Sequence, residues 1–163
     1  MGLKKKQKNK KRSNSGGLDR NTRKMVMLAD NQVWQAFAKK PVAQKTQTSL
    51  ALASRKALYA LANGDGELAQ VNELIVSAYA GLILAEQGYG EDQLSVFHSA
   101  LKTLIECRDR TDVGGAYCIT EVEGHLVDDL LALHEQQVQL ARKAELAAAL
   151  VDGYSRAKEI VRQ

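Results

Sequence analysis

The sequence predicts an all-α protein: a helical bundle of about four main helices with short N- and C-terminal helices, preceded by a disordered basic tail. The chain has a single proline in 163 residues, and proline is the residue that a helix interior tolerates least. It is rich in Ala, Leu, Gln, Glu and Lys, which lose little rotamer freedom in a helix. Apolar residues recur at spacings of three and four along most of the chain, as on the buried face of an amphipathic helix.

Residues 1–17 form the predicted tail. They are rich in Lys, Asn, Ser and Gly and show no hydrophobic periodicity. Such a segment buries too little apolar surface to offset its chain entropy, so we expect disorder in the free protein. We expect residues 18–163 to fold as a single α-helical domain, which is an ordinary size for one domain.

The first two helices are bounded by local signals. The first covers about residues 20–38 and lies across the bundle; it ends before Pro41, because the residue before a proline is biased away from the helical region. The second follows N-cap candidates at residues 46–49 and ends at residues 63–66, Asn-Gly-Asp-Gly. Its apolar positions have helical spacing: Leu50, Ala53, Ala57, Leu58 and Leu61.

The third helix has the clearest pattern. Its apolar residues alternate in steps of three and four: Leu68, Val71, Ile75, Ala78, Leu82 and Ala85. It ends at residues 88–90, Gly-Tyr-Gly. A fourth helix begins beside Glu91 and Asp92, since a helix N-terminus favours negative charge, and it carries Leu94, Phe97, Leu101, Leu104 and Ile105 on its apolar face.

After a break at residues 111–115, helical spacing continues from Ile119 to Val151. This predicts one helix about 50 Å long. Asp152-Gly153 marks its end or a kink, and a short last helix follows. Beyond Leu133 the apolar face becomes small and polar, so the region 137–151 is covered by the short helices or packs against a second copy as a homodimer.

Charge is divided unevenly along the chain. Residues 1–24 hold ten Lys or Arg and one acidic residue, a net charge of +9, whereas the remainder holds 13 basic and 18 acidic residues, a net charge of −5. Clustered lysines neutralise phosphates without reading base sequence. We therefore expect the basic segment to contact nucleic acid, DNA or RNA, through Lys4, Lys5, Lys6, Lys8, Lys10, Lys11, Arg12, Arg20, Arg23 and Lys24. A solubility or targeting tail, and contact with anionic lipid or an acidic protein, are the alternatives.

Sequence-specific DNA reading is disfavoured. A helix-turn-helix could be drawn over residues 48–86, but the start of its second helix carries Glu67 and Glu73 and no basic residue. Recognition helices present their N-terminal residues to bases beside phosphates, where carboxylates are repelled.

Metal and cofactor sites are also not expected. Glu121, His125, Asp128 and Asp129 lie within two helical turns, with Cys118 and His134 nearby. However, the chain contains neither Cys-x-x-Cys nor His-Glu-x-x-His. We interpret the cluster as exposed charges on a helix face.

Catalysis is not expected either. The minimum pair for a cysteine nucleophile would be Cys107 or Cys118 with His98 or His125. Cys107 is more simply interpreted as a small core residue. The one feature of Cys118 that favours a nucleophile is its position near a predicted helix start. We expect no catalytic residues.

The sequence thus predicts a non-enzymatic accessory or regulatory protein that binds nucleic acid with its basic arm, the helical body serving for oligomerisation or partner binding. Trp34 and Phe37 are candidate contacts with a protein partner, since Trp is enriched at interface hot spots. The alternative is an adaptor or inhibitor that acts through its helical surface. No run of about 18 apolar residues indicates a membrane span, and no secretory signal is evident, so we expect a cytoplasmic protein with reduced cysteines.

Overall fold

The computed structural model describes residues 31–110 and 116–160. The chain divides into two units, residues 1–34 and residues 35–163. In the first unit the described residues, 31–34, are helical. The predicted disordered tail lies outside the described residues. The second unit, called the body below, is all-α as predicted.

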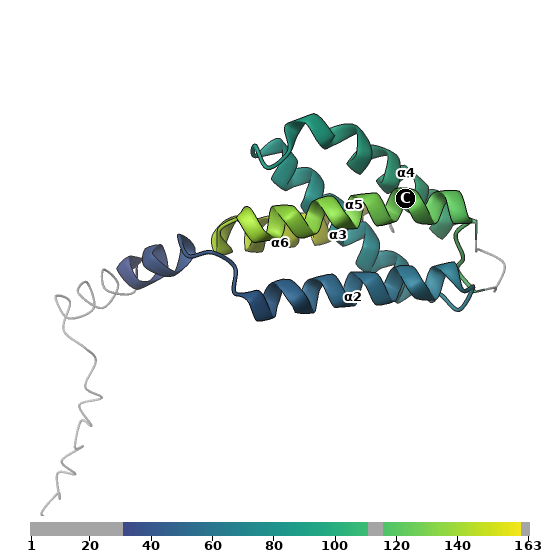
Figure 1. Ribbon diagram of the computed structural model, residues 1–163, viewed down its shortest axis with the longest axis horizontal. Coiled ribbons are helices and arrows are strands. Elements are labelled where there is room, and N and C mark those ends of the chain that lie inside the picture. Colours follow the sequence, from purple (N-terminus) through teal and green to yellow (C-terminus); the bar gives the residue numbers. More distant parts are fainter. Residues whose placement is uncertain (1–30, 111–115, 161–163) are drawn as a thin grey trace, which may run out of the picture. The chain divides into compact units, whose positions relative to one another are not determined.

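From Gln44 onward, the described residues of the body form five α-helices and one 3₁₀ helix, in the order α2 (Gln44–Ala62), α3 (Leu68–Glu86), η1 (Glu91–Gln93), α4 (Leu94–Asp109), α5 (Glu121–Leu140) and α6 (Lys143–Ile160). The central helix is α3, which packs against α2, α4, α5 and α6 (Figure 1). It is the one described helix long and apolar enough to cross a membrane, with a mean hydropathy of 1.5. Because 61% of that apolar window is buried inside the body, α3 has the surroundings of the core helix of a bundle.

Local signals set several helix ends where the sequence predicts them. Gly64 and Gly88 have φ angles of 78° and 100°, in the left-handed region that favours glycine, directly after α2 and α3. At the start of α5, the Thr120 side chain accepts a hydrogen bond from the Glu123 N–H, and the Thr120 N–H donates to the Glu123 carboxylate at 2.8 Å. This is a capping box, which satisfies two N–H groups at the helix start.

The predicted single helix from Ile119 to Val151 is wrong. The chain leaves helical geometry at Ala141, with φ −67° and ψ 151°, and turns into α6 at Lys143. Neither glycine nor proline occupies the break, so nothing in the local sequence marks it.

Contacts with a distant segment stabilise this break. Pro41 and Arg142 form an isolated antiparallel bridge, and the Lys143 N–H donates to the Lys40 carbonyl at 3.0 Å. The Glu145 carboxylate accepts a hydrogen bond from the Arg142 N–H at 2.8 Å. The turn is therefore held partly by the segment before α2, a tertiary interaction.

Of the two alternatives predicted at Asp152-Gly153, an end or a kink, the end and the separate last helix are wrong, because α6 continues to Ile160. Gly153 is buried in the middle of α6 and lies against α3. A Cβ atom at this position would lie 3.1 Å from both the Ala80 nitrogen and the Val76 oxygen. The glycine here allows two helices to approach closely.

The predicted buried face of this stretch is displaced. Its apolar spacing predicts burial of Val122, Leu130, Gln137, Leu140 and Val151, among others; of these, Leu130 and Gln137 are buried, whereas Val122, Leu140 and Val151 are exposed. The other buried residues of α5 are Val127, Leu131, His134 and Val138. The buried residues of region 137–151 pack within this chain: Gln137, Val138, Ala141, Leu146 and Ala149. A homodimer through this region stays a prediction.

Candidate functional site

The ten basic residues predicted to contact nucleic acid lie outside the described residues. Of the two candidate partner contacts, Trp34 belongs to the first unit and its side chain is exposed. Phe37 belongs to the body, where the Nζ atom of Lys143 lies 4.4 Å from the centre of its ring. This is a cation–π distance.

The acidic cluster that sequence reasoning rejected as a metal site is dispersed. His125 Nε2 and Glu121 Oε1 lie 4.0 Å apart on the exposed face of α5. The Asp128 carboxylate is paired with Arg55 of α2. In the described parts of the chain, no group of three His, Cys, Asp or Glu side chains is arranged to hold a metal ion.

The two cysteines have different environments. Cys107 is buried, its Sγ donates to the Cys118 carbonyl at 3.2 Å, and Cys118 is exposed. Burial raises the pKa of the Cys107 thiol. A thiol with a raised pKa is a poor nucleophile at neutral pH.

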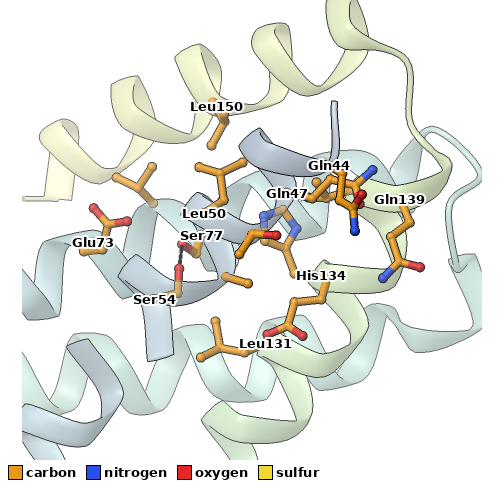
Figure 2. A pocket seen from close by; sticks show the side chains of 15 residues that line it. Gln44, Gln47, Leu50, Ser54, Glu73, Ser77, Leu131, His134, Gln139 and Leu150 are labelled. Carbon is orange, nitrogen blue, oxygen red and sulfur yellow. Dashed lines mark hydrogen bonds between the residues drawn. The ribbon is translucent and has the colours of Figure 1, made fainter. Parts of the chain in front are cut away.

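A cavity that the sequence does not reveal lies within the body. It has a volume of about 510 Å³ and is lined by residues of α2, α3, α5 and α6. The buried residues of α2 are Ser54, Ala57 and Leu61, all in its C-terminal half. The N-terminal half of α2 covers the cavity, with Gln44, Gln47 and Leu50 along the lining (Figure 2).

The segment before α2 fixes the helix at this end. Val42 is buried in a small apolar cluster with residues of α3, α5 and α6. The Gln47 side chain donates to the Val42 carbonyl at 2.9 Å. Both ends of α2 are therefore packed against the body on either side of the cavity.

Three buried polar side chains face the cavity. The hydroxyls of Ser54 and Ser77 form a hydrogen bond of 3.0 Å across the α2–α3 contact (Figure 2). His134 of α5 is 6% exposed and lines the same space. In Figure 2 its ring extends from α5 into the region between Ser77 and the two glutamines of α2.

The protonation state of His134 follows from its partner, Gln137. The Gln137 Nε2 donates to the carbonyls of Gly81 at 3.0 Å and of Tyr89 at 2.8 Å, so its Oε1 is the atom that meets His134 Nδ1 at 3.2 Å. An amide oxygen only accepts; Nδ1 therefore carries the proton, and Nε2 is the lone-pair nitrogen. Burial lowers the pKa of His134, against the opposing hydrogen bond to Gln137 and the charge of Glu135, which favours the neutral ring.

Charges at the lining of the cavity are mainly negative. Glu73 and Glu135 both contribute to it, and the Glu135 carboxylate accepts from Arg55 Nε at 2.8 Å. The remaining lining includes the apolar side chains of Leu50, Val76, Leu131, Val138 and Leu150. Polar side chains also line it, including Gln44, Gln47, Thr48 and Gln139. Apolar walls with a few polar groups suit a small organic molecule.

A sequence signal for this site exists but depends on the register of α5. His134 and Gln137 are three residues apart, which places them on one helix face, and that face is buried. The face predicted from the sequence contains Gln137 but not His134, so the pair is not recognised. Comparison of the chain with protein-family models, curated proteins and solved structures finds no match.

Proposed function

We propose that the protein is a non-enzymatic accessory or regulatory factor of the cytoplasm that binds nucleic acid through its basic N-terminal arm, residues 4–24. The helical body is the oligomerisation or partner-binding module. The observation that carries the proposal is the separation of charge: +9 in residues 1–24 against −5 in the remainder. A compact cluster of lysines releases the counterions condensed on nucleic acid, which gives affinity without sequence preference.

Ion pairs in the body support the assignment of binding to the arm. Several arginines of the body are already paired with carboxylates: Arg55 with Glu135 and Asp128, Arg108 with Asp109, Arg110 with Glu123, and Arg156 with Asp152. An arginine held by a carboxylate contributes little net positive potential to a phosphate. The acidic surplus of the body would also repel the nucleic-acid backbone.

One part of the body is basic. The bridge between Pro41 and Arg142, and the hydrogen bond from the Lys143 N–H to the Lys40 carbonyl, place two basic dipeptides beside each other: residues 39–40 and 142–143. Lys39, Lys40 and Arg142 are exposed. This cluster would extend the phosphate contacts of the arm onto the body.

The test compares the full-length protein with a variant in which the seven basic residues between 4 and 12 are replaced by Gln, which keeps chain length and removes charge. With about six phosphates engaged, the slope of log affinity against log salt should be about −5 on duplex DNA, and most of the affinity should disappear in the variant. A chain starting at Leu18 should behave like the variant and keep its helical circular dichroism. A second full-length variant, Lys39→Gln with Lys40→Gln, should reduce the slope by at most about 2.

A second function, as an adaptor acting through the helical surface, is favoured by one observation. Val151 and Tyr154 of α6 are exposed at 69% and 62%, and they continue a line from Ala144 and Ala147 at spacings of three and four. Such a line is the kind of surface that packs against a partner helix. Equal binding of nucleic acid by the wild type and the Gln variant would contradict binding through the basic arm. The adaptor function would then be the remaining proposal.

A further inference from the structure

We propose that the cavity between α2, α3, α5 and α6 binds a small, largely apolar molecule that is not an anion and carries one hydroxyl or N–H donor, and that this donor binds Nε2 of His134. This site is independent of the basic arm. It would make the helical body a sensor or carrier of a small molecule.

Size and rigidity point to a ligand site. A volume of about 510 Å³ lies within the range of roughly 300–1,000 Å³ that is typical of ligand pockets. The buried residues of the C-terminal half of α2 pack in the main core, and Val42 holds the segment before the helix. A cavity that is preformed in this way costs little reorganisation on binding.

The donor requirement comes from His134. Its Nδ1 is engaged by Gln137 at 3.2 Å, and no hydrogen bond to Nε2 is formed within the described residues. Nε2 is not fully enclosed, since Arg108 Nη1 is the one enclosed polar side-chain atom without a partner in the described part of the chain. It can therefore be reached from the cavity and can accept a hydrogen bond there. A ligand hydroxyl or N–H at this position would donate a hydrogen bond to Nε2, so that both ring nitrogens would be hydrogen-bonded (Figure 2).

The charged residues of the lining disfavour an anion. Glu73 and Glu135 would repel an anion. Leu50, Val76 and Leu150 provide the apolar walls against which an aromatic or aliphatic body packs. The hydroxyls of Ser54 and Ser77 are bonded to each other at 3.0 Å. The other uncharged polar residues of the lining are exposed or half-buried (Gln44, Gln47, Thr48 and Gln139), so the imidazole is the buried directing group.

Three probes of nearly equal shape test the proposal: phenol, which has a donor; toluene, which has none; and benzoate, which is an anion. Binding is measured on the full-length protein by isotope-edited NMR titration. Phenol and toluene should bind with dissociation constants on the order of 1 mM, as expected for so few atoms, and benzoate should bind at least about tenfold more weakly. Failure of phenol and toluene to bind at all, or binding of benzoate as tight as that of phenol, would overturn the proposal.

A matched pair of variants locates the binding site. Ala51 of α2 lines the cavity, whereas Ala53 of the same helix is exposed. Ala51→Trp should fill the cavity and abolish binding of both neutral probes, and Ala53→Trp should leave it unchanged. Unchanged binding by a folded Ala51→Trp variant would contradict this location.

The role of His134 is tested by His134→Asn, whose side-chain NH₂ can replace Nδ1 as the donor to Gln137 while the Nε2 acceptor is lost. Phenol affinity should fall about tenfold, the loss of one hydrogen bond, and toluene affinity should stay within about twofold. The wild type gives the same answer without mutation: phenol, and not toluene, should shift the ¹⁵N resonance of Nε2. Equal ¹⁵N shifts with both probes, or equal loss of both affinities in a folded variant, would refute the donor contact.

Discussion

Replacement of Gln137 by Leu tests whether the buried polar network stabilises the body. Gln137 is 5% exposed. Its side-chain Nε2 on α5 donates hydrogen bonds to the Gly81 carbonyl of α3 and to the Tyr89 carbonyl in the turn after α3. Its oxygen also accepts from His134. Leucine has a similar volume, so the substitution removes hydrogen bonds without opening a large cavity.

The expected cost can be worked from the groups left without partners. The Gly81 carbonyl lies inside α3, where a backbone N–H four residues later already binds it, so its loss is small. The Tyr89 carbonyl and His134 Nδ1 each lose a buried partner, at about 1–3 kcal/mol apiece. The free energy of unfolding should therefore fall by about 2–6 kcal/mol, a large share of the roughly 5–15 kcal/mol typical of a domain.

Urea unfolding followed by circular dichroism measures this loss, and calorimetry should show a melting temperature lower by about 10 °C. Gln136→Leu is the matched control, because Gln136 is the exposed neighbour on the same helix; it should change stability by no more than about 0.5 kcal/mol. A Gln137→Leu protein as stable as the wild type, with the same urea dependence, would refute the assignment of a stabilising network to this residue.

Two further perturbations follow from buried groups. Because burial lowers the pKa of His134, the unfolded chain binds a proton at a higher pH than the folded one; stability should fall as pH drops below about 6.5, by at most about 1.4 kcal/mol per unit. In the wild type, the urea concentration at the unfolding midpoint should decrease between about pH 7 and pH 5, and His134→Asn should remove the part of this decrease that comes from His134. The same pH dependence in both proteins would contradict the assignment to His134. In Gly81→Ala, the new Cβ would overlap the ring of fully buried Phe97, and we expect a loss of about 1–3 kcal/mol that outweighs the helix-propensity gain. Gly124→Ala is its control, since the Cβ would meet only Ile119 at 3.7 Å; it should stabilise by about 0.5–1 kcal/mol in the same urea titration, and similar effects of the two substitutions would contradict the packing argument.

The parts of the fold that the sequence predicts correctly are those determined by local chemistry. The ends of α2 and α3 coincide with glycines at positive φ, Gly64 and Gly88. The apolar spacing of α3 identifies its buried face, with Val71, Ile75, Ala78, Leu82 and Ala85 all buried. Leu68 is the exception, at the solvent-exposed start of the helix. A strong periodic pattern between two glycine-containing turns specifies a helix by itself.

The break between α5 and α6 could not be predicted in this way. Residues 137–147 contain no helix-breaking residue, and the apolar spacing runs through them. The turn depends on the segment around Pro41, about a hundred residues earlier, whose backbone pairs with Arg142 and Lys143. Periodicity reports which faces are apolar, but it carries no information about a partner so distant in the chain.

The cavity was missed for a related reason, and the same reason connects the stability of the body to its proposed ligand. A run of leucines predicts that a helix face is buried, but whether the neighbouring helix packs along its whole length depends on how both ends are held. Here α2 packs in the main core only through its C-terminal half, and the space beneath the other half contains His134. Gln137 holds that imidazole by Nδ1 and binds α3 with its own amide. The residue that stabilises the contact between α3 and α5 is thus also the residue that turns Nε2 toward the cavity, so a substitution at Gln137 should disturb folding and ligand orientation together.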